Sequence, residues 1–235
     1  MSRIIITTCG TSLYKSSCWK WNSLNNIPIS TLNSEPKRLR DRQFKCEEAI
    51  IQAQNSDKSG KILAETFDKS SWDDLGRLRD LPAELASLRV IQNFCEKNGK
   101  PLNNTDKLYL LYADNEEAQY CANILHKVLI DFNLLNNIVI ETPWKIEDLD
   151  PKDIGRFQTS IKSFWEKLIK IMPDNSGNRY YLNLTGGYKS TVILSSAVLK
   201  SSFLFFKGLR VLPPQILHYI LYKNRTIRDL YSQPC

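Results

Sequence analysis

The feature that most restricts the fold of this chain is its alternation of short apolar segments with longer amphipathic ones. The short segments, rich in branched and aromatic residues, predict strands at Arg3–Thr8, Lys107–Tyr112, Asn137–Thr142, Tyr180–Leu184 and Ile216–Tyr222. The longer segments predict helices at Leu81–Asn98, from Asn115 to about Leu135, and at Asp153–Ile171 and Ser190–Phe206. Strands separated by helices pair in parallel and bury both of their faces. The sequence therefore predicts the α/β fold class, with a mostly parallel sheet and helices on both of its faces.

Two segments depart from this alternation. Pro143–Pro151 is polar and predicts a linker between elements. The stretch at about residues 20–79 combines a region rich in aromatic, Asn and Ser residues with a basic helical pattern and a short helix predicted at Lys61–Phe67. We expect residues 1–235 to form one domain, in which 20–79 is a helical and loop insertion on the core or a lid over the site.

Composition restricts the classes of compartment and partner. No apolar run reaches the roughly 18–20 residues of a membrane-spanning helix, and the first residues turn polar too soon for a signal peptide. We therefore expect a cytoplasmic protein without membrane contact. Six cysteines form no CxxC pair and only two histidines are present, so no metal site or other cofactor is expected. The net charge of +7 is spread along the chain, which favours a localised anion pocket or a mildly basic face over a broad nucleic-acid-binding surface, and no DNA partner is expected.

One predicted strand–turn–helix junction has the local features of an anion site. The strand at Tyr180–Leu184 continues into Thr185, Gly186, Gly187, Tyr188 and Lys189 before the next helix begins. Paired glycines permit backbone conformations closed to other residues, and the turn directs unpaired N–H groups and a helix N-terminus at one point. Lys189 adds a positive charge there. These residues alone fit a phosphate site and an ordinary tight turn equally well.

Two further turns follow predicted strands and are expected at the same edge of the sheet. The first contains Cys9, Gly10, Thr11 and Ser12, whose small and hydroxyl side chains suit either backbone capping or phosphate binding. The second contains Asp114 or Asn115 as a cap for the following helix. Ligands of parallel sheets bind outside the carboxyl ends of the strands, near the point where the strand order reverses. This convergence favours a ligand site made by the first turn and the 185–189 turn.

The same motifs resemble those of the CRISPR-associated Rossmann-fold (CARF) family, in particular its short stand-alone branch that includes ring nucleases. The resemblance rests on one strand ending in Thr-Thr-Cys-Gly-Thr-Ser (7–12) and a late one ending in Asn-Leu-Thr-Gly-Gly-Tyr-Lys (183–189). Between them, Pro82–Leu88 looks like the family's Ala-Glu-Ile helix. Asp114–Ala118 looks like its Asp-Thr-Glu-Glu-Gly turn, with Asn115 and Ala118 in place of Thr and Gly. The resemblance spans most of the chain except 20–79 and implies a Rossmann-like form of the α/β fold.

The resemblance also implies a ligand and a set of contacts. A homodimer of this family binds cyclic oligoadenylate, the second messenger of type III CRISPR systems, and cyclic tetra-adenylate is the natural match to two equivalent subunits. Ligand contacts are implied for Cys9, Gly10, Thr11, Ser12, Asp114, Asn115, Thr185, Gly186, Gly187, Tyr188 and Lys189. We expect Lys189 to stabilise charge during cleavage, and Ser12 to position either the ribose 2′-OH or the phosphate.

Three functions remain open from the sequence. The leading hypothesis is a ring nuclease that cleaves the ring without metal to linear products ending in a 2′,3′-cyclic phosphate, which switches off type III signalling. The second is a non-catalytic sensor that regulates a separate partner protein. The third is a nucleotide- or RNA-binding α/β domain outside CRISPR.

Overall fold

A parallel sheet organises the part of the chain that the structure describes. A computed structural model describes residues 2–19, 60–136, 138–149 and 178–183, together with 55, 160, 163–164, 166–168 and 170–172. Its strands are β1 (Arg3–Cys9), β2 (Lys107–Ala113), β3 (Val139–Ile140), β4 (Trp144–Ile146) and β5 (Arg179–Asn183). The sheet order is β3-β2-β1-β5, β4 also pairs with β2, and every pair is parallel. The predicted α/β class with a parallel sheet is confirmed.

The central strand β1 is buried along its whole length. It pairs with β2 on one side, with Ile4 opposite Lys107 and Cys9 opposite Tyr112. On its other side it pairs with β5, with Thr7 opposite Asn183. A strand with a parallel neighbour on each side and a layer over each face has no exposed position. This explains the apolar run Ile4–Ile6 and the burial of Thr7 and Thr8 beyond it.

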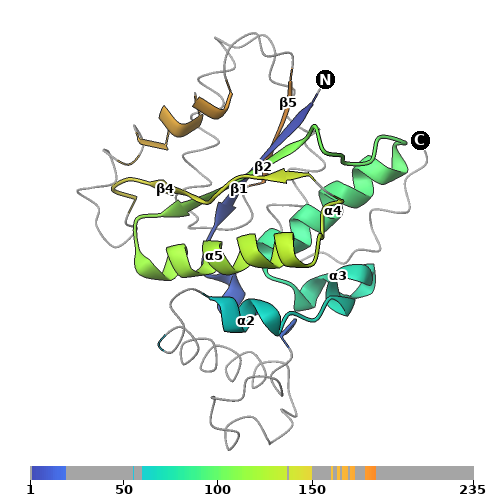
Figure 1. The fold of residues 1–235 in the computed structure, drawn as a ribbon, viewed down its shortest axis with the longest axis horizontal. Helices are drawn as coiled ribbons and strands as arrows, with labels where there is room; N and C mark the ends of the chain where they lie inside the picture. The colour runs from blue at the N-terminus through green and yellow to red at the C-terminus, as the bar shows by residue number, and fades with distance from the viewer. Residues whose placement is uncertain are drawn as a thin grey trace, which may run out of the picture.

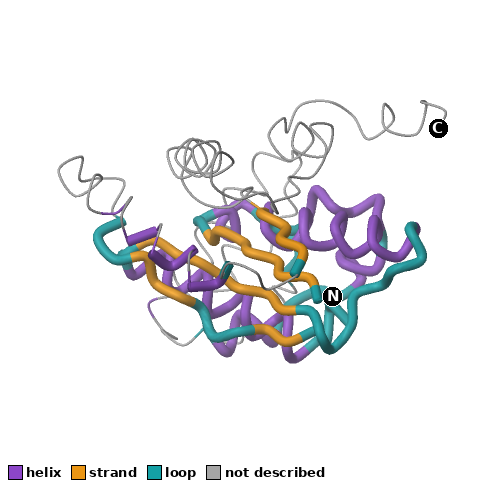
Figure 2. Tube along the Cα trace, turned by 90° about the horizontal axis from the view of Figure 1, so that it is seen from above, coloured by secondary structure: helices purple, strands orange, loops and turns teal. Residues whose placement is uncertain are grey.

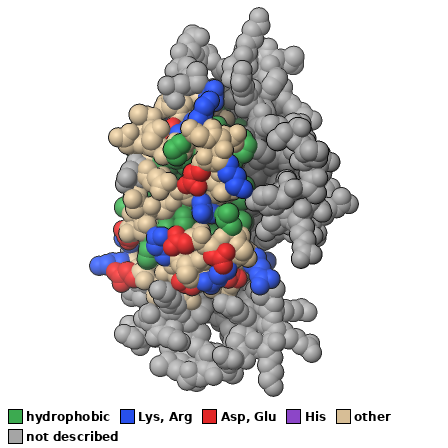
Figure 3. Space-filling model, turned by 90° about the vertical axis from the view of Figure 1, so that its right-hand side faces the viewer, with side chains coloured by type: hydrophobic (Ala, Val, Ile, Leu, Met, Phe, Trp, Pro, Cys, Tyr) green, Lys and Arg blue, Asp and Glu red, His purple; other side chains and the backbone are tan. Residues whose placement is uncertain are grey.

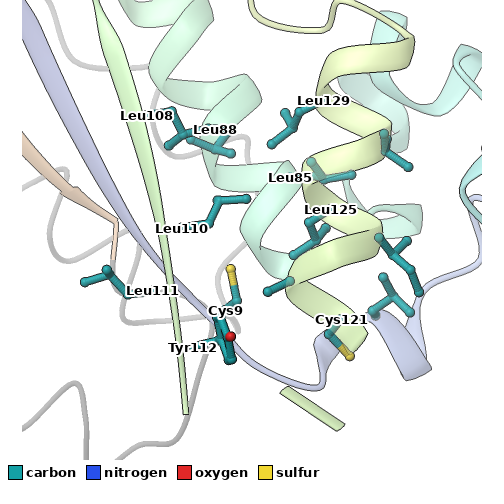
Figure 4. Close-up of a cluster of buried hydrophobic side chains, with 14 of the residues drawn as sticks. Cys9, Leu85, Leu88, Leu108, Leu110, Leu111, Tyr112, Cys121, Leu125 and Leu129 are labelled. Atoms are coloured by element: carbon teal, nitrogen blue, oxygen red, sulfur yellow. The ribbon is translucent and has the colours of Figure 1, made fainter. Parts of the chain in front are cut away.

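Two long helices, α4 (Ala83–Lys97) and α5 (Glu116–Asp131), pack on the same face of the sheet (Figure 1). Figure 4 shows side chains of both helices gathered over one face of β2, with the labelled leucines Leu85, Leu88, Leu125, Leu129, Leu108 and Leu110. All six are at most 1% exposed. Within the described ranges, no helix is both long and apolar enough to cross a bilayer.

The opposite face of the sheet is covered as well. Side chains alternate along a strand, so Tyr109 faces away from the side that Leu108 and Leu110 occupy. Its ring lies 5.4 Å from that of Trp144 on β4, and Lys167 Nζ lies 5.6 Å from the Trp144 ring. Lys167 belongs to helical positions between 160 and 171 that contribute buried apolar side chains to the core. Helices therefore flank both faces of the strand layer, which Figure 2 shows from above.

The described end of the 20–79 stretch is part of the core. It forms α2 (Lys61–Glu65), α3 (Ser70–Asp73) and the 3₁₀ helix η4 (Leu75–Asp80), and α2 confirms the short helix predicted at Lys61–Phe67. Gly60 has a φ of 71°, and a Cβ at this position would lie 2.4 Å from Ile124 Cγ1 on α5. Only glycine allows α2 to approach α5 this closely. The remainder of the stretch lies outside the described residues apart from residue 55.

The Phe67 side chain shows how this segment joins the core. Its ring packs edge-on against Trp19 at 5.9 Å and against Phe132 at 5.2 Å. Phe67 itself is 1% exposed. Residues 60–80 therefore complete the hydrophobic layer beneath α5, whereas the predicted insertion or lid applies to residues that the structure does not describe.

Two expectations from the sequence need correction. Pro143–Pro151 is not only a linker, because β4 forms within it and pairs with Leu111–Ala113 of β2. The helical spacing of the apolar residues also predicts one face of α4 made by Leu85, Leu88, Val90, Ile91 and Phe94. The buried side instead runs through Leu85, Leu88, Ile91 and Cys95, whereas Phe94 is 40% exposed. The predicted elements at Ser190–Phe206 and Ile216–Tyr222 lie outside the described residues.

Candidate functional site

The turn after β1 lies at the carboxyl edge of the sheet and leads into η1 (Ser12–Lys15). Cys9 and Gly10 are buried, whereas Thr11 and Ser12 are half-buried. The Cys9 side chain belongs to the apolar cluster of Figure 4, and burial, followed by the Glu84 carboxylate, raises the pKa of its thiol well above the ordinary value. A ligand contact at Cys9 would therefore involve its backbone. Thr11 and Ser12 are the residues of this turn with side chains near solvent.

A buried carboxylate connects this turn to helix α4. Glu84 lies in the first turn of α4 and has 0% exposure. Its Oε1 accepts a hydrogen bond from the Gly10 N–H at 2.8 Å, and its Oε2 accepts one from the Ser12 hydroxyl. The Ser12 Oγ also accepts the Ala83 N–H at 3.0 Å. Ser12 therefore caps the start of α4 and presents its own proton to Glu84.

The end of β5 lies beside the same turn. The Asn183 Nδ2 group makes long hydrogen bonds to Thr7 Oγ1 at 3.4 Å and to the Glu84 backbone oxygen at 3.5 Å. The chain proceeds from β1 to β2 on one side and returns to β5 on the other side of β1, so the strand order reverses between β1 and β5. The predicted ligand residues Thr185, Gly186, Gly187, Tyr188 and Lys189 follow β5 directly but lie outside the described residues.

The turn after β2 forms a second part of the same edge. The Asn115 side chain accepts the Ala118 N–H at 2.8 Å and so caps α5, as the sequence predicts for this turn. Asp114 Oδ1 lies 3.2 Å from Lys145 Nζ, and Asp114 Oδ2 accepts the Asp148 N–H at 3.2 Å. Both predicted contact residues therefore already have structural partners within the chain.

A pocket opens at this second turn. It has a volume of about 330 Å³ and a mixed polar lining made by Tyr112, Asp114, Asn115, Glu116, Gln119 and Lys145. Lys145 lies between Asp114 and Glu147, whose Oε2 is 3.0 Å away, and these carboxylates raise the pKa of its ammonium group. Burial raises the pKa of Tyr112 despite the opposing effect of Lys145, so its hydroxyl stays protonated. The pocket offers hydrogen-bond donors and acceptors close to one another. Since Cys9 and Tyr112 are paired in register, this pocket lies one strand away from the Ser12 turn.

Charges elsewhere on the described surface are mixed. Figure 3 shows one side of the molecule, where Lys and Arg side chains lie among Asp and Glu side chains. Ion pairs also form around α3 and η4: Lys69 Nζ lies 2.6 Å from Asp73 Oδ1, and Arg77 Nη1 lies 3.3 Å from Asp68 Oδ2. The described part of that side has no continuous basic patch, and no group of three or more His, Cys, Asp or Glu residues among the described residues is arranged to hold a metal ion.

Sequence reasoning did not assign a site role to Glu84 or Lys145. Glu84 is within Pro82–Leu88, the segment that resembles the Ala-Glu-Ile helix, and an acidic residue in a first helical turn is usually explained by the helix dipole. Its partner Ser12 is 72 positions earlier in the chain. Only the packing of α4 against the end of β1 brings the two side chains together. Lys145 lay in the segment expected to be a linker.

Comparison with known proteins identifies a family. Residues 79–204, more than half of the chain, match the model of a family described as CRISPR-associated protein (Cas_APE2256). The matched region begins in η4 and includes α4, β2, α5 and β5. No curated protein matches the chain.

Proposed function

We propose that this chain, which belongs to the Cas_APE2256 family of CRISPR-associated proteins, is a ring nuclease that opens cyclic oligoadenylate. Membership of the family gives it a role in a CRISPR system. The proposal adds the ligand, with cyclic tetra-adenylate as the preferred ring, and the reaction, which yields linear products with a 2′,3′-cyclic phosphate. Its consequence for the cell is to end type III CRISPR signalling.

The observation that carries the proposal is the position of Ser12 at the reversal of strand order. Open parallel sheets bind nucleotides outside this point because the connections diverge there and leave a crevice. Ser12 is half-buried at that edge, next to the strand that leads into the 185–189 turn. Its hydroxyl is held by two hydrogen bonds to α4, so its orientation is fixed before any ligand arrives.

The chemistry needs no covalent enzyme intermediate. A ribose 2′-OH attacks the adjacent phosphate in line, and the bond to the departing 5′ oxygen breaks. The protein has to align these atoms and stabilise the charge that develops on the phosphate oxygens. Ser12 is proposed for alignment and Lys189 for charge stabilisation. A homodimer would present both residues twice to a ring with two-fold symmetry.

Incubation of the purified protein with cyclic tetra-adenylate, followed by chromatography, tests this function. We expect linear products with a 2′,3′-cyclic phosphate at equal rates in EDTA and in magnesium. Lys189→Ala is expected to lower the cleavage rate by about 100-fold or more, a typical effect of removing one charge-stabilising group. Lys15→Ala, which removes an exposed lysine close in sequence to Ser12, is the matched control and is expected to retain its rate.

Two other results would change the assignment. Tight binding of the ring without cleavage over hours would identify a non-catalytic sensor that acts through a separate partner protein. Equal affinity for linear and cyclic oligoadenylate would indicate a general nucleotide- or RNA-binding domain.

A further inference from the structure

We propose that Glu84 is a positioning residue for ring opening, which acts through Ser12 on the ribose 2′-OH. In this arrangement Ser12 meets the ligand as a hydrogen-bond acceptor and relays the 2′-OH proton to the Glu84 carboxylate. The inference rests on the proposed function and deepens it. It chooses between the ribose 2′-OH and the phosphate as the group that Ser12 positions, and it adds a residue to the reaction.

The hydrogen bonds of Ser12 determine what it can offer a ligand. A serine hydroxyl has one proton to donate and two positions at which it can accept. The proton is directed to Glu84 Oε2, and one acceptor position is filled by the Ala83 N–H at 3.0 Å. Among the described residues nothing fills the second acceptor position. Ser12 therefore offers a ligand an acceptor, because its only proton is already in use.

This property selects the ribose hydroxyl over the phosphate. Phosphate oxygens of a diester are acceptors, so a contact with the remaining Ser12 lone pair would be repulsive. The nearby Gly10 N–H, which otherwise suits a phosphate, already donates to Glu84 Oε1 at 2.8 Å. A ribose 2′-OH carries the proton that the Ser12 acceptor position requires. It is also the nucleophile of the proposed reaction.

Burial makes Glu84 the only destination for the Ser12 proton within this arrangement. Its side chain has 0% exposure, so water does not compete for the carboxylate. The first turn of α4 and the Gly10 N–H supply partial positive charge to the same carboxylate. One oxygen is held by the backbone and the other faces Ser12, which keeps the carboxylate aligned for proton transfer.

The resulting step balances in atoms and charge. As the 2′ oxygen bonds to phosphorus, its proton moves to Ser12 Oγ, and the Ser12 proton moves to Glu84 Oε2. The bond between phosphorus and the 5′ oxygen breaks, and that oxygen takes a proton from water. After the product leaves, Glu84 returns its proton through Ser12 to the hydroxide that remains. Ser12 forms no bond to phosphorus at any stage.

Substitution of Glu84 tests the relay. Glu84→Gln keeps the shape of the side chain, but its amide donates to Ser12 and turns the hydroxyl proton toward the ligand. We expect the rate of ring opening to fall about 100- to 10,000-fold, the usual contribution of a general base. The affinity of Glu84→Gln for a 2′-deoxy cyclic tetra-adenylate should remain within about threefold of the wild-type affinity, because this analogue has no 2′-OH to position. Glu117→Gln is the matched control with an unchanged rate, because Glu117 is the exposed second residue of α5 as Glu84 is the buried second residue of α4.

A double-mutant cycle separates the relay from a purely structural role. Groups that act as one unit lose their effect together, so Glu84→Gln added to Ser12→Ala should lower the rate no further than Ser12→Ala alone. Glu84→Asp retains a carboxylate and should recover part of the rate. The relay is overturned if the double variant loses the product of the two single rate losses. It is also overturned if a folded Glu84→Asp variant recovers none of the rate.

Measurements on the wild-type protein keep the test open if Glu84 variants fail to fold. Two protons move in the relay, so a plot of the rate against the deuterium fraction in mixed H₂O and D₂O should be curved, as the product of two linear factors. A linear dependence would contradict it. If the wild-type protein opens the ring and Glu84→Gln opens it equally fast, only the relay is refuted. The proposed function then stands.

Failure of the proposed function gives a different pattern. If wild-type protein binds the ring but does not open it, cleavage is refuted and the acceptor role of Ser12 is measured by binding alone. The 2′-hydroxyl ring should then bind about tenfold tighter than a 2′-fluoro ring, the value of roughly one good hydrogen bond. This preference should disappear in Ser12→Ala. Equal affinities in the wild type, or no binding of either ring, would refute the acceptor role as well.

Discussion

Buried charged side chains secure both ends of the central strand. At the carboxyl end, Glu84 holds the turn that contains Gly10 and Ser12. At the amino end, the Arg3 guanidinium forms an ion pair with Asp106, with Nη2 2.6 Å from Oδ2 and Nε 3.1 Å from Oδ1. The Asp106 carboxylate also accepts the backbone N–H groups of Arg3 and Asn103 at 2.7 and 2.9 Å. The contacts of Glu84 lie at the proposed site, whereas the Arg3–Asp106 pair lies at the opposite edge of the sheet.

Removal of Asp106 is therefore expected to affect stability and not ligand binding. The side chains of Arg3 and Asp106 are 10% and 1% exposed, so Asp106→Ala leaves a buried cation without its counter-ion and two backbone N–H groups without their acceptor. We expect the free energy of unfolding to fall by about 3–5 kcal/mol, as for other buried pairs that lose one partner. Urea denaturation followed by circular dichroism measures the change.

The neighbouring Lys107–Glu141 pair is the control for this substitution. Its Nζ and Oε1 atoms lie 3.2 Å apart, but the side chains are 45% and 32% exposed. Glu141→Ala should cost at most about 1 kcal/mol because water screens the pair. Similar losses for Asp106→Ala and Glu141→Ala would contradict the assignment of Arg3 and Asp106 as a buried structural pair.

At the scale of the elements, α5 depends on a single side-chain cap. Asn115 accepts the Ala118 N–H at 2.8 Å and leaves Glu116 and Glu117 in the first turn, where the helix dipole favours them. Asn115→Ala should lower the free energy of unfolding by about 1 kcal/mol. Asn115→Ser should retain most of the stability, since Ser is an equally good cap. Thermal unfolding of the three proteins tests this expectation, and an equal loss for Ala and Ser would show that capping is not the role of Asn115.

The same scale shows which elements a sequence can predict. β1, β2 and the two long helices have enough buried positions to produce a pattern, and their predicted bounds lie close to the observed ones. β4 has three residues, of which only Ile146 is buried, so its sequence has no detectable period. It exists because Leu111–Ala113 of β2 offer backbone partners, which is a tertiary effect. The exposure of Phe94 also has a tertiary cause, because the packing of α4 buries the side that contains Gln92 and Cys95 instead. The Gln92 amide donates to the Leu134 carbonyl, which fixes this side toward the core.

The candidate site divides in the same way. The turns that follow β1 and β2 were predictable because the carboxyl ends of parallel strands share an edge. The hydrogen bonds of Ser12 were not, since they depend on how α4 packs against β1. Local sequence therefore identified the loops that form the edge, while the donor and acceptor state of each side chain depended on contacts between distant segments.

For the whole molecule, the reversal of strand order and the proposed two-fold ligand lead to a prediction of stoichiometry. Each chain provides one Ser12 edge, and a ring with two-fold symmetry is matched by two such edges in a homodimer. We expect light scattering to give a mass of two chains and calorimetry to give one cyclic tetra-adenylate per two chains. Ligand that binds only the folded dimer should stabilise it by about 2.7 kcal/mol at 100 times its Kd. One ring per chain, or a monomer that binds with undiminished affinity at high dilution, would contradict a shared site and assign the whole contact surface to a single subunit.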